Sequence, residues 1–576
     1  MKHIIALILV IAVAVNFGSP THAQDSDDAS KPQLWQGVLD VGGQKLTMNF
    51  EVTVTGDEFS GSVATPEQGN QTIPLSSMSI EDGNVEIEVD KVGGKFTGKL
   101  NEAGDQVVGV WQQRGNELEL TINRVDSFDS GEHIETWKGT LDVGIKLEMG
   151  LKVYRQEDGS LTAKLDSYTQ NVTGIPIEFE KDGDTYKMSH SGMQMEYEGK
   201  LNEEETKLEG TFTQAGREIE LNMEKVELNY EAEEKKRPQE PKEPFDYDST
   251  DVTYENEVDA LTLAGTLTTP KGDGPFPAAI LISGSGPQNR NEELLGHKPF
   301  LVIADYLTRN GIAVLRFDDR GVGESTGEFE TSNSADFAKD VAAAVDFLKT
   351  QTKIDAGKIG LVGHSEGGLI APMLAANRED VAFIVMMAGP GVDGMEILKS
   401  QSQAILQATD ETAALLEANM EFYSAIEKLI DAENQLTAES ITAASDDVIA
   451  NIEDEAVREQ MQAAVQPTVD TLTGPWMNFF IQYDPEPTLK QVKCPVLAIN
   501  GEKDLQVLVD LNLDAIEKSL QEGGNTNFEI VRMPNMNHLF QETDGDGSPA
   551  EYGNIEETFS PKALKVISDW IRKQTS

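Results

Sequence analysis

The chain has 576 residues, of which 39% are hydrophobic and 25% are charged, a composition typical of a folded protein with several cores. Asp and Glu number 100 and Lys and Arg 46, so the formal net charge at pH 7 is −54. Such a surface repels phosphate backbones and anionic lipids, which argues against nucleic acid or a membrane surface as a partner. Cys494 is the single cysteine and therefore excludes an intramolecular disulfide.

Residues 1–23 have the pattern of a secretory signal peptide. Lys2 supplies a positive start, residues 4–15 (IIALILVIAVAV) form a short apolar core, and THA at 21–23 offers a small residue for cleavage. The apolar core is short for a bilayer span, so we expect cleavage rather than an uncleaved anchor, and no membrane insertion afterwards. Because no cysteine lies at the cleavage site, we expect a secreted or periplasmic protein that is not a lipoprotein.

An internal repeat follows the signal. LWQGVLDVG begins at Leu34 and TWKGTLDVG at Thr136, and further matched segments keep an offset of 101 or 102 residues. Both copies, residues 30–127 and 132–228, alternate apolar and polar residues with the period of a strand. We expect each copy to be an antiparallel all-β module, either a small barrel or a sandwich. Neither copy contains a catalytic constellation.

Residues 229–250 are charged, contain prolines and lack periodicity, which is typical of a linker. In residues 251–576, short Val/Ile/Leu-rich runs alternate with amphipathic helical stretches, a pattern that predicts a mostly parallel, doubly wound sheet. Residues 393–480 interrupt this alternation because they are Ala- and Glu-rich and helical throughout. We interpret them as an inserted helical cap.

Two serines stand in a Gly-x-Ser-x-Gly pattern. Ser365, in LVGHSEGGLI, directly follows the apolar strand KIGLV and precedes a helical stretch. A nucleophile elbow requires this strand-turn-helix context, because the sharp turn presents the hydroxyl at the carboxyl edge of the sheet. Ser325, in GVGESTGEF, lies in a glycine-rich loop with no strand immediately before it. The sequence therefore favours Ser365 as the nucleophile.

A serine nucleophile needs a base, and the base needs an acid that orients it. His538 follows the last predicted strand, FEIVRMP, in a loop at the carboxyl edge of the sheet. Asp504 follows the strand CPVLAIN, with Glu502 as the neighbouring alternative. The chain order Ser365, Asp504, His538 is the order of an α/β-hydrolase triad. His364 neighbours the serine and is expected to point elsewhere.

The developing oxyanion needs backbone N–H donors. We expect one from Glu366, directly after the nucleophile, and the other from the turn ISGSGPQNR that follows an earlier strand. Within that turn the Ser285 amide is favoured, with Gly286 next. An ordinary glycine turn is the alternative interpretation of the same segment.

Several motifs together resemble a known family. These are GSGPQNRN, FDDRGVGEST, GHSEGG, PWMNFFIQYDP, CPVLAINGEKDLQV, MPNMNHLFQ and EYGNIEETFSP. Residues 245–576 are similar to bacterial secreted α/β-hydrolases of the serine carboxylesterase group, and more distantly to serine aminopeptidases and acyl-thioester hydrolases. The resemblance implies that Ser365, Asp504 and His538 form the triad and that the loop at Asp319 and Arg320 is structural. The repeats resemble modules found ahead of such hydrolases.

The leading hypothesis is a secreted serine esterase that cleaves small carboxylic esters through an acyl-enzyme. Trp476, Phe479, Phe480 and Tyr483 close the cap, either as a wall for short or medium acyl groups or as core. A serine aminopeptidase or a thioester hydrolase would use the same machinery. A secreted binding protein that works through the repeats is the non-enzymatic alternative. No metal or nucleotide cofactor is indicated.

Overall fold

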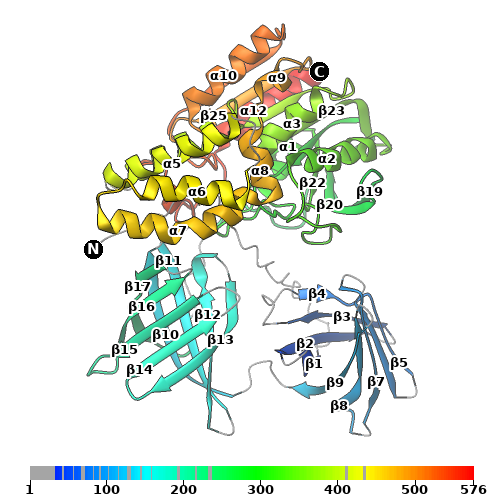
Figure 1. Ribbon diagram of the computed structural model, residues 1–576. Coiled ribbons are helices and arrows are strands. Elements are labelled where there is room, and N and C mark those ends of the chain that lie inside the picture. The colour runs from blue at the N-terminus through cyan, green and yellow to red at the C-terminus, as the bar shows by residue number, and fades with distance from the viewer. Residues whose placement is uncertain are drawn as a thin grey trace. The chain divides into compact units, whose positions relative to one another are not determined.

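The computed structural model describes residues 33–576 except 42–43, 56–57, 66–71, 82, 90–91, 102, 114–115, 126–130, 143–145, 157–158, 171, 191–194, 215–216, 231–235, 409–412 and 432–435. The predicted signal peptide, residues 1–23, lies outside the described residues. The described chain forms two compact units, which divide between residues 233 and 234 (Figure 1).

The first β module is a single antiparallel sheet in its described residues, with the strand order β4-β3-β2-β1-β9-β8-β7-β6-β5 (Figure 1). Its strands are β1 (Gln33–Val41), β2 (Gln44–Thr55), β3 (Glu58–Ala64), β4 (Thr72–Pro74), β5 (Ser77–Glu81), β6 (Asn84–Val89), β7 (Gly94–Leu100), β8 (Gln106–Gln113) and β9 (Asn116–Val125). Their inward positions form one core around Phe50, Phe96 and Trp111, as alternation of apolar and polar residues predicts.

The second β module has the order β15-β14-β13-β12-β11-β10-β18-β16-β17, and β15 also pairs with β16. Its elements are β10 (Glu132–Asp142), β11 (Lys146–Arg155), β12 (Leu161–Ser167), the 3₁₀ turn η3 (Tyr168–Gln170), β13 (Val172–Asp182), β14 (Thr185–His190), β15 (Met195–Leu201), β16 (Lys207–Gln214), β17 (Arg217–Glu220) and β18 (Met223–Val226). The extra pairing closes the sheet into a barrel filled by side chains such as Trp137, Leu151 and Tyr186.

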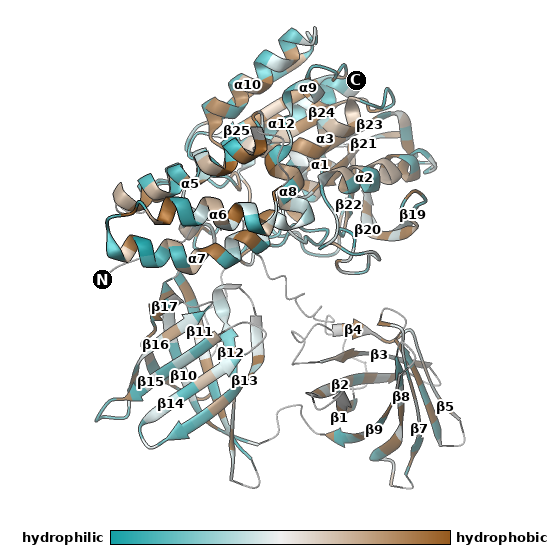
Figure 2. Cartoon of the chain, in the orientation of Figure 1, coloured by the Kyte–Doolittle hydropathy of each residue, from teal (hydrophilic) through white to brown (hydrophobic). Residues whose placement is uncertain are grey.

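The two modules follow the same meander. In the second, β13 pairs with β12 through its first half and with β14 through its second half. In the first, β4 pairs with β3 and β5 pairs with β6, so these two short strands occupy the place of β13. Each module is thus one barrel-like sheet, not a two-sheet sandwich, and apolar and polar bands alternate along its strands (Figure 2).

The second unit is built on a sheet with the order β19-β20-β22-β21-β23-β24-β25-β26. Its strands are β19 (Asp248–Asn256), β20 (Leu261–Thr269), β21 (Phe276–Ile282), β22 (Ala313–Phe317), β23 (Ile354–His364), β24 (Ile384–Met387), β25 (Val496–Gly501) and β26 (Phe528–Met533). β20 pairs antiparallel with both of its neighbours, β19 and β22. The remaining strands, in the spatial order β22-β21-β23-β24-β25-β26, pair parallel. The predicted mostly parallel sheet is therefore present.

Helices cover both faces of this sheet, which is why its central strands are buried along their whole length. One face packs against α2 (Ser334–Lys349), α3 (Glu366–Ala375) and α10 (Val509–Glu522), and the other against α1 (Pro299–Arg309) and α12 (Pro561–Thr575). The short helices α9 (Glu486–Leu489) and α11 (Pro549–Tyr552) lie in connecting segments. The parallel strands thus end at one common edge, where the predicted site residues follow them.

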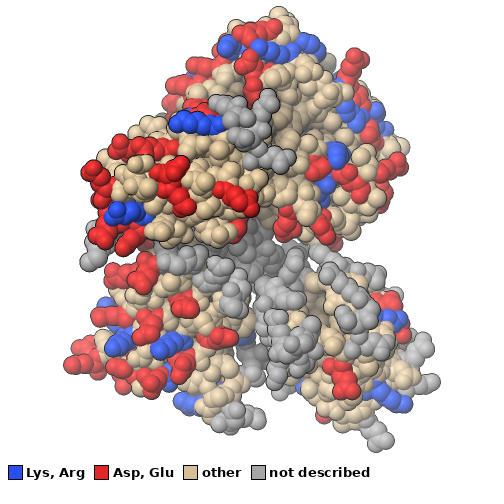
Figure 3. Space-filling view, viewed as in Figure 1, with Lys and Arg blue, Asp and Glu red and all other residues tan. Residues whose placement is uncertain are grey.

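The segment between β24 and β25 is helical and has a core of its own around Phe422, Ile441 and Met461. Its helices are α4 (Gly394–Ala408), α5 (Ala413–Asp431), α6 (Ala438–Ile449), α7 (Glu455–Thr473) and α8 (Pro475–Gln482). On the face drawn in Figure 3, acidic side chains gather over these cap helices. No helix within the described residues has the length and apolar character that a bilayer crossing requires.

The predicted linker, residues 229–250, differs from the structure in its second half. Arg237 donates to the backbone carbonyls of Gly296, Leu295, Gly553 and Ile555, with N···O distances of 2.9–3.2 Å. Further along the segment, Gln239 pairs with the backbone of 558–559, Tyr247 is buried, and β19 begins at residue 248. This half belongs to the second unit, because Arg237 and Gln239 bind backbone groups of that unit that are distant in sequence.

Candidate active site

Ser365 sits at a sharp turn between β23 and α3. Its backbone has φ 51° and ψ −115°, a conformation that non-glycine residues rarely adopt and that marks a strained turn. A Cβ atom on Gly363 would lie 1.9 Å from the Gly367 carbonyl oxygen, and one on Gly367 would lie 2.1 Å from that of Ile282. The glycines therefore let strand and helix approach closely enough to form the turn.

Asp504 and His538 meet at the carboxyl edge of the sheet, after β25 and β26. The His538 Nδ1 atom lies 2.8 Å from Asp504 Oδ2, and both side chains are buried. The other carboxylate oxygen, Oδ1, accepts the backbone N–H groups of Gln506 and Val507 at 2.8 and 2.9 Å. Because Nδ1–H donates to the carboxylate, Nε2 is left as the basic nitrogen. The alternative acid, Glu502, is exposed to solvent.

The nucleophile turn and the histidine loop lie side by side. The ring of His364, the residue before Ser365, is 4.9 Å from the ring of His538 between centroids. The His364 Nε2 atom also lies 3.0 Å from the His538 carbonyl oxygen. The structure thus brings the segments that carry Ser365, Asp504 and His538 to one place on the sheet edge.

The predicted oxyanion turn lies against the same serine. A Cβ atom on Gly284 would be 3.3 Å from the Cβ of Ser365, so this residue of the turn borders the nucleophile. The Gly284 amide is already used, because it donates to Glu292 Oε1 at 2.7 Å. The Ser285 amide donates to no other described residue. The Glu366 amide is the first of α3 and so has no partner inside the helix.

Asp319 stabilises the oxyanion turn through two hydrogen bonds. Its carboxylate accepts the Ser283 hydroxyl at 2.8 Å and the Gln288 amide at 2.9 Å, so it holds both ends of the turn. Burial raises the pKa of Asp319 well above its usual range, and the nearby carboxylates of Glu366 and Asp340 raise it further. The family resemblance implied that the loop containing Asp319 is structural. The Asp319 carboxylate holds the oxyanion turn in place through these two hydrogen bonds.

The side chain of Glu366 is a feature that the sequence reasoning missed. It is buried beside the nucleophile, and its Oε1 accepts the Ser334 hydroxyl at 2.6 Å and the Trp476 indole N–H at 2.7 Å. Burial raises the pKa of Glu366 to about 7. Trp476 belongs to α8 and stacks on Phe480, so this carboxyl group joins the cap to the nucleophile turn. A cavity adjoins the turn and is lined by Ser283, Gly284, Asp319, Glu366 and apolar side chains.

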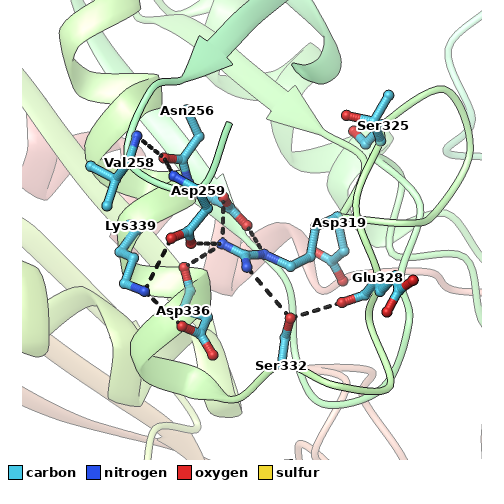
Figure 4. Close-up of polar contacts among 12 residues, drawn as sticks. Asn256, Val258, Asp259, Asp319, Ser325, Glu328, Ser332, Asp336 and Lys339 are labelled. Atoms are coloured by element: carbon cyan, nitrogen blue, oxygen red, sulfur yellow. Dashed lines mark hydrogen bonds and ion pairs between the residues drawn. The ribbon is translucent and has the colours of Figure 1, made fainter. Parts of the chain in front are cut away.

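Ser325, the second serine in the Gly-x-Ser-x-Gly pattern, has a different environment. It is buried, donates to the Asp318 carbonyl at 2.7 Å and accepts the Ala264 amide at 3.0 Å. Arg320 donates to the carboxylates of Asp340 and Asp259. Figure 4 shows Asp259, which also accepts from Lys339. Ser325 and Arg320 thus stabilise the loop through internal hydrogen bonds and ion pairs.

Within the described ranges, no cluster of three or more His, Cys, Asp or Glu side chains is arranged to hold a metal ion. Cys494 precedes β25 and is partly buried, and burial raises the pKa of its thiol to about 12.

Comparison with known proteins gives independent evidence on the class of this protein. Residues 259–535 match the model of the X-Pro dipeptidyl-peptidase (S15) family. Esterase EstD of Thermotoga maritima is 26% identical over 333 residues, which cover 57% of this chain and 70% of the relative. The 2,6-dihydropseudooxynicotine hydrolase of Paenarthrobacter nicotinovorans is 27% identical over 176 residues, which cover 30% of this chain and 45% of the relative.

Among solved structures, an esterase of Pyrococcus furiosus, Pf2001, aligns with 57% of this chain and 93% of its own, at 16% identity and a TM-score of 0.34. The family match and the sequence relatives support a serine-type hydrolase of the class that includes the S15 peptidases and the α/β-hydrolase esterases.

Proposed function

We propose that the protein is a secreted or periplasmic serine esterase that cleaves carboxylic esters through an acyl-enzyme. The observation that carries this proposal is the 2.8 Å contact between Asp504 and the Nδ1 atom of His538, beside the strained turn of Ser365. A buried carboxylate on Nδ1 keeps the imidazole in the tautomer whose Nε2 can accept a proton. The relatedness to an esterase supports esters as the substrate class.

In this mechanism, the Ser365 hydroxyl attacks the ester carbonyl carbon while Nε2 of His538 takes the hydroxyl proton. The carbonyl oxygen becomes an oxyanion that the Ser285 and Glu366 amides stabilise. Collapse of the intermediate breaks the C–O bond, and His538 returns the proton to the leaving alcohol. A water molecule, activated by the same histidine, then releases the acid and restores Ser365.

The test is a pair of matched serine variants assayed on p-nitrophenyl acetate and butyrate. Ser365→Ala should lose activity by a factor on the order of 10⁶ in kcat, because the nucleophile is removed. Ser325→Ala, in the same sequence pattern, should keep the activity of its folded fraction. Circular dichroism and thermal midpoints identify the folded fraction of each variant. Full activity of folded Ser365→Ala would refute the mechanism.

A second candidate function is hydrolysis of peptide bonds near a free N-terminus. The match of residues 259–535 to a peptidase family favours it, and the same serine, histidine and aspartate would serve. Side-by-side assays on p-nitrophenyl esters and on dipeptidyl or aminoacyl anilides separate the two candidates. Turnover of anilides without turnover of esters would replace the esterase proposal by the peptidase. A protein that turns over neither and also resists a fluorophosphonate would be a binding protein.

A further inference from the structure

His364 occupies the centre of the candidate site although the proposed reaction assigns it no step. Its side chain is buried between the nucleophile turn, the oxyanion turn and the histidine loop. Its Nδ1 atom lies 2.9 Å from Glu292 Oε1, and its Nε2 atom lies 3.0 Å from the carbonyl oxygen of His538. The same Glu292 oxygen accepts the Gly284 amide at 2.7 Å.

The partners of the ring indicate which of its nitrogens carry protons. A carbonyl oxygen can only accept, so Nε2 must donate to His538. Glu292 Oε1 accepts the Gly284 amide, and as a carboxylate oxygen it also accepts from Nδ1. Both nitrogens then donate, and a doubly protonated imidazole is a cation. The charge of Glu292 and the two hydrogen bonds raise the pKa of His364, against the opposing effect of burial.

Charged and titratable groups of the described residues lie close to this ring. Glu292 contacts it directly, the His538 ring lies 4.9 Å away, and Asp504 lies behind His538. Asp504 also acts to raise the pKa of His364. The ring thus lies between two acidic groups, and a cation there is paired.

We infer that His364, held as an imidazolium by Glu292, is the positioning residue of the site. Through Nε2 it fixes the backbone of His538, and through Glu292 it fixes the Gly284 amide at the start of the oxyanion turn. The residue before the nucleophile therefore ties the base and the oxyanion donors to Ser365. This inference rests on the proposed function only in naming those roles, since the contacts themselves do not depend on it.

Loss of the proton from His364 has a defined effect. A neutral imidazole carries one N–H, so one of the two hydrogen bonds must be lost. Because the pKa in the folded protein is raised above 6.5, the contribution is present at lower pH and is lost as pH rises through the folded pKa. The alkaline limb of the activity profile should therefore include the titration of His364.

The first test reads the proton directly, on the full chain labelled with ¹⁵N-histidine. His364→Gln identifies the signals of His364 by their disappearance. At pH 6.5, the ordinary midpoint of a histidine, His364 is expected to have both ring nitrogens protonated in more than half of the molecules. A single protonated nitrogen at that pH would overturn the inference, whether or not the protein hydrolyses esters. This measurement needs no variant to be active and so stays separate from the test of the proposed function.

The second test is kinetic. His364→Gln should lower kcat for a p-nitrophenyl ester about 100-fold with little change in KM, the loss expected when reacting groups are misplaced by about 1 Å. Glu292→Gln keeps an oxygen for the Gly284 amide but removes the negative charge, so the alkaline limb of the kcat profile should move to lower pH. His190→Gln, in the second β module, is the control. An unchanged pH profile in Glu292→Gln would contradict the positioning role.

Discussion

Replacing Glu366 by Gln tests the electrostatics of the nucleophile turn. Burial places the pKa of this carboxyl at about 7 in the folded protein, against an ordinary value of 4.5. A raised pKa means that stability is present while the group is protonated and falls as pH rises from 4.5 through 7. The full difference of 2.5 units corresponds to about 3.4 kcal/mol, of which about 2.5 kcal/mol develops between pH 5 and pH 8.

Gln is neutral at every pH and can still accept the Ser334 and Trp476 hydrogen bonds. The free energy of unfolding of Glu366→Gln minus that of wild type should therefore increase by about 2.5 kcal/mol from pH 5 to pH 8, because only wild type loses stability over this range. Urea unfolding followed by tryptophan fluorescence measures this double difference, in which the pH-independent effect of the substitution cancels. Glu529→Gln, at an exposed position of β26, is the control and should show no such trend. Parallel pH dependences of Glu366→Gln and wild type would refute the reasoning.

Three further substitutions test the acid, the turn and the docked segment. Asp504→Asn should lower kcat about 10⁴-fold in a folded protein, because the wrong tautomer of His538 is held, and an unchanged kcat would exclude Asp504 as the acid. Gly367→Ala should lower the free energy of unfolding by at least about 3 kcal/mol, since its Cβ would lie 2.1 Å from a carbonyl oxygen. Gly357→Ala is the control: its Cβ would lie 3.5 Å from the nearest atom, so its thermal midpoint should be nearly unchanged. Arg237→Ala should lower the free energy of unfolding by about 2 kcal/mol or more, and with it the urea midpoint, whereas Lys236→Ala should not; equal midpoints would contradict the docking of this segment.

Local sequence context predicted the parts of the site that local geometry determines. The strand, glycines and helix around Ser365 are contiguous, so the turn followed from its own sequence. Asp504 and His538 could be named because each follows an apolar strand, and parallel strands end at one edge of the sheet. The sequence could not distinguish a barrel from a sandwich, because both produce the same alternation of apolar and polar residues. The pairing of β15 with β16, and of β13 with both β12 and β14, identifies the barrel.

Other contacts between distant segments could not be predicted from the sequence. His364 was expected to point elsewhere, and the sequence named no partner for it. Its partners Glu292 and His538 could not be identified because they lie 72 and 174 residues away along the chain. Arg237 lay in a segment that lacks periodicity and finds carbonyls more than 300 residues away. A backbone carbonyl carries no sequence signature, so a charged residue that binds one is indistinguishable from a solvated residue until the fold is known.

Mass mapping of a fluorophosphonate adduct on the wild-type protein would show whether Ser365 is the activated serine. Such a probe reacts with a serine only when a neighbouring base activates it. We expect one adduct, on the peptide that contains Ser365, and a large fall in labelling rate in Asp504→Asn. An unlabelled folded protein, or an adduct on Ser325 instead, would contradict it.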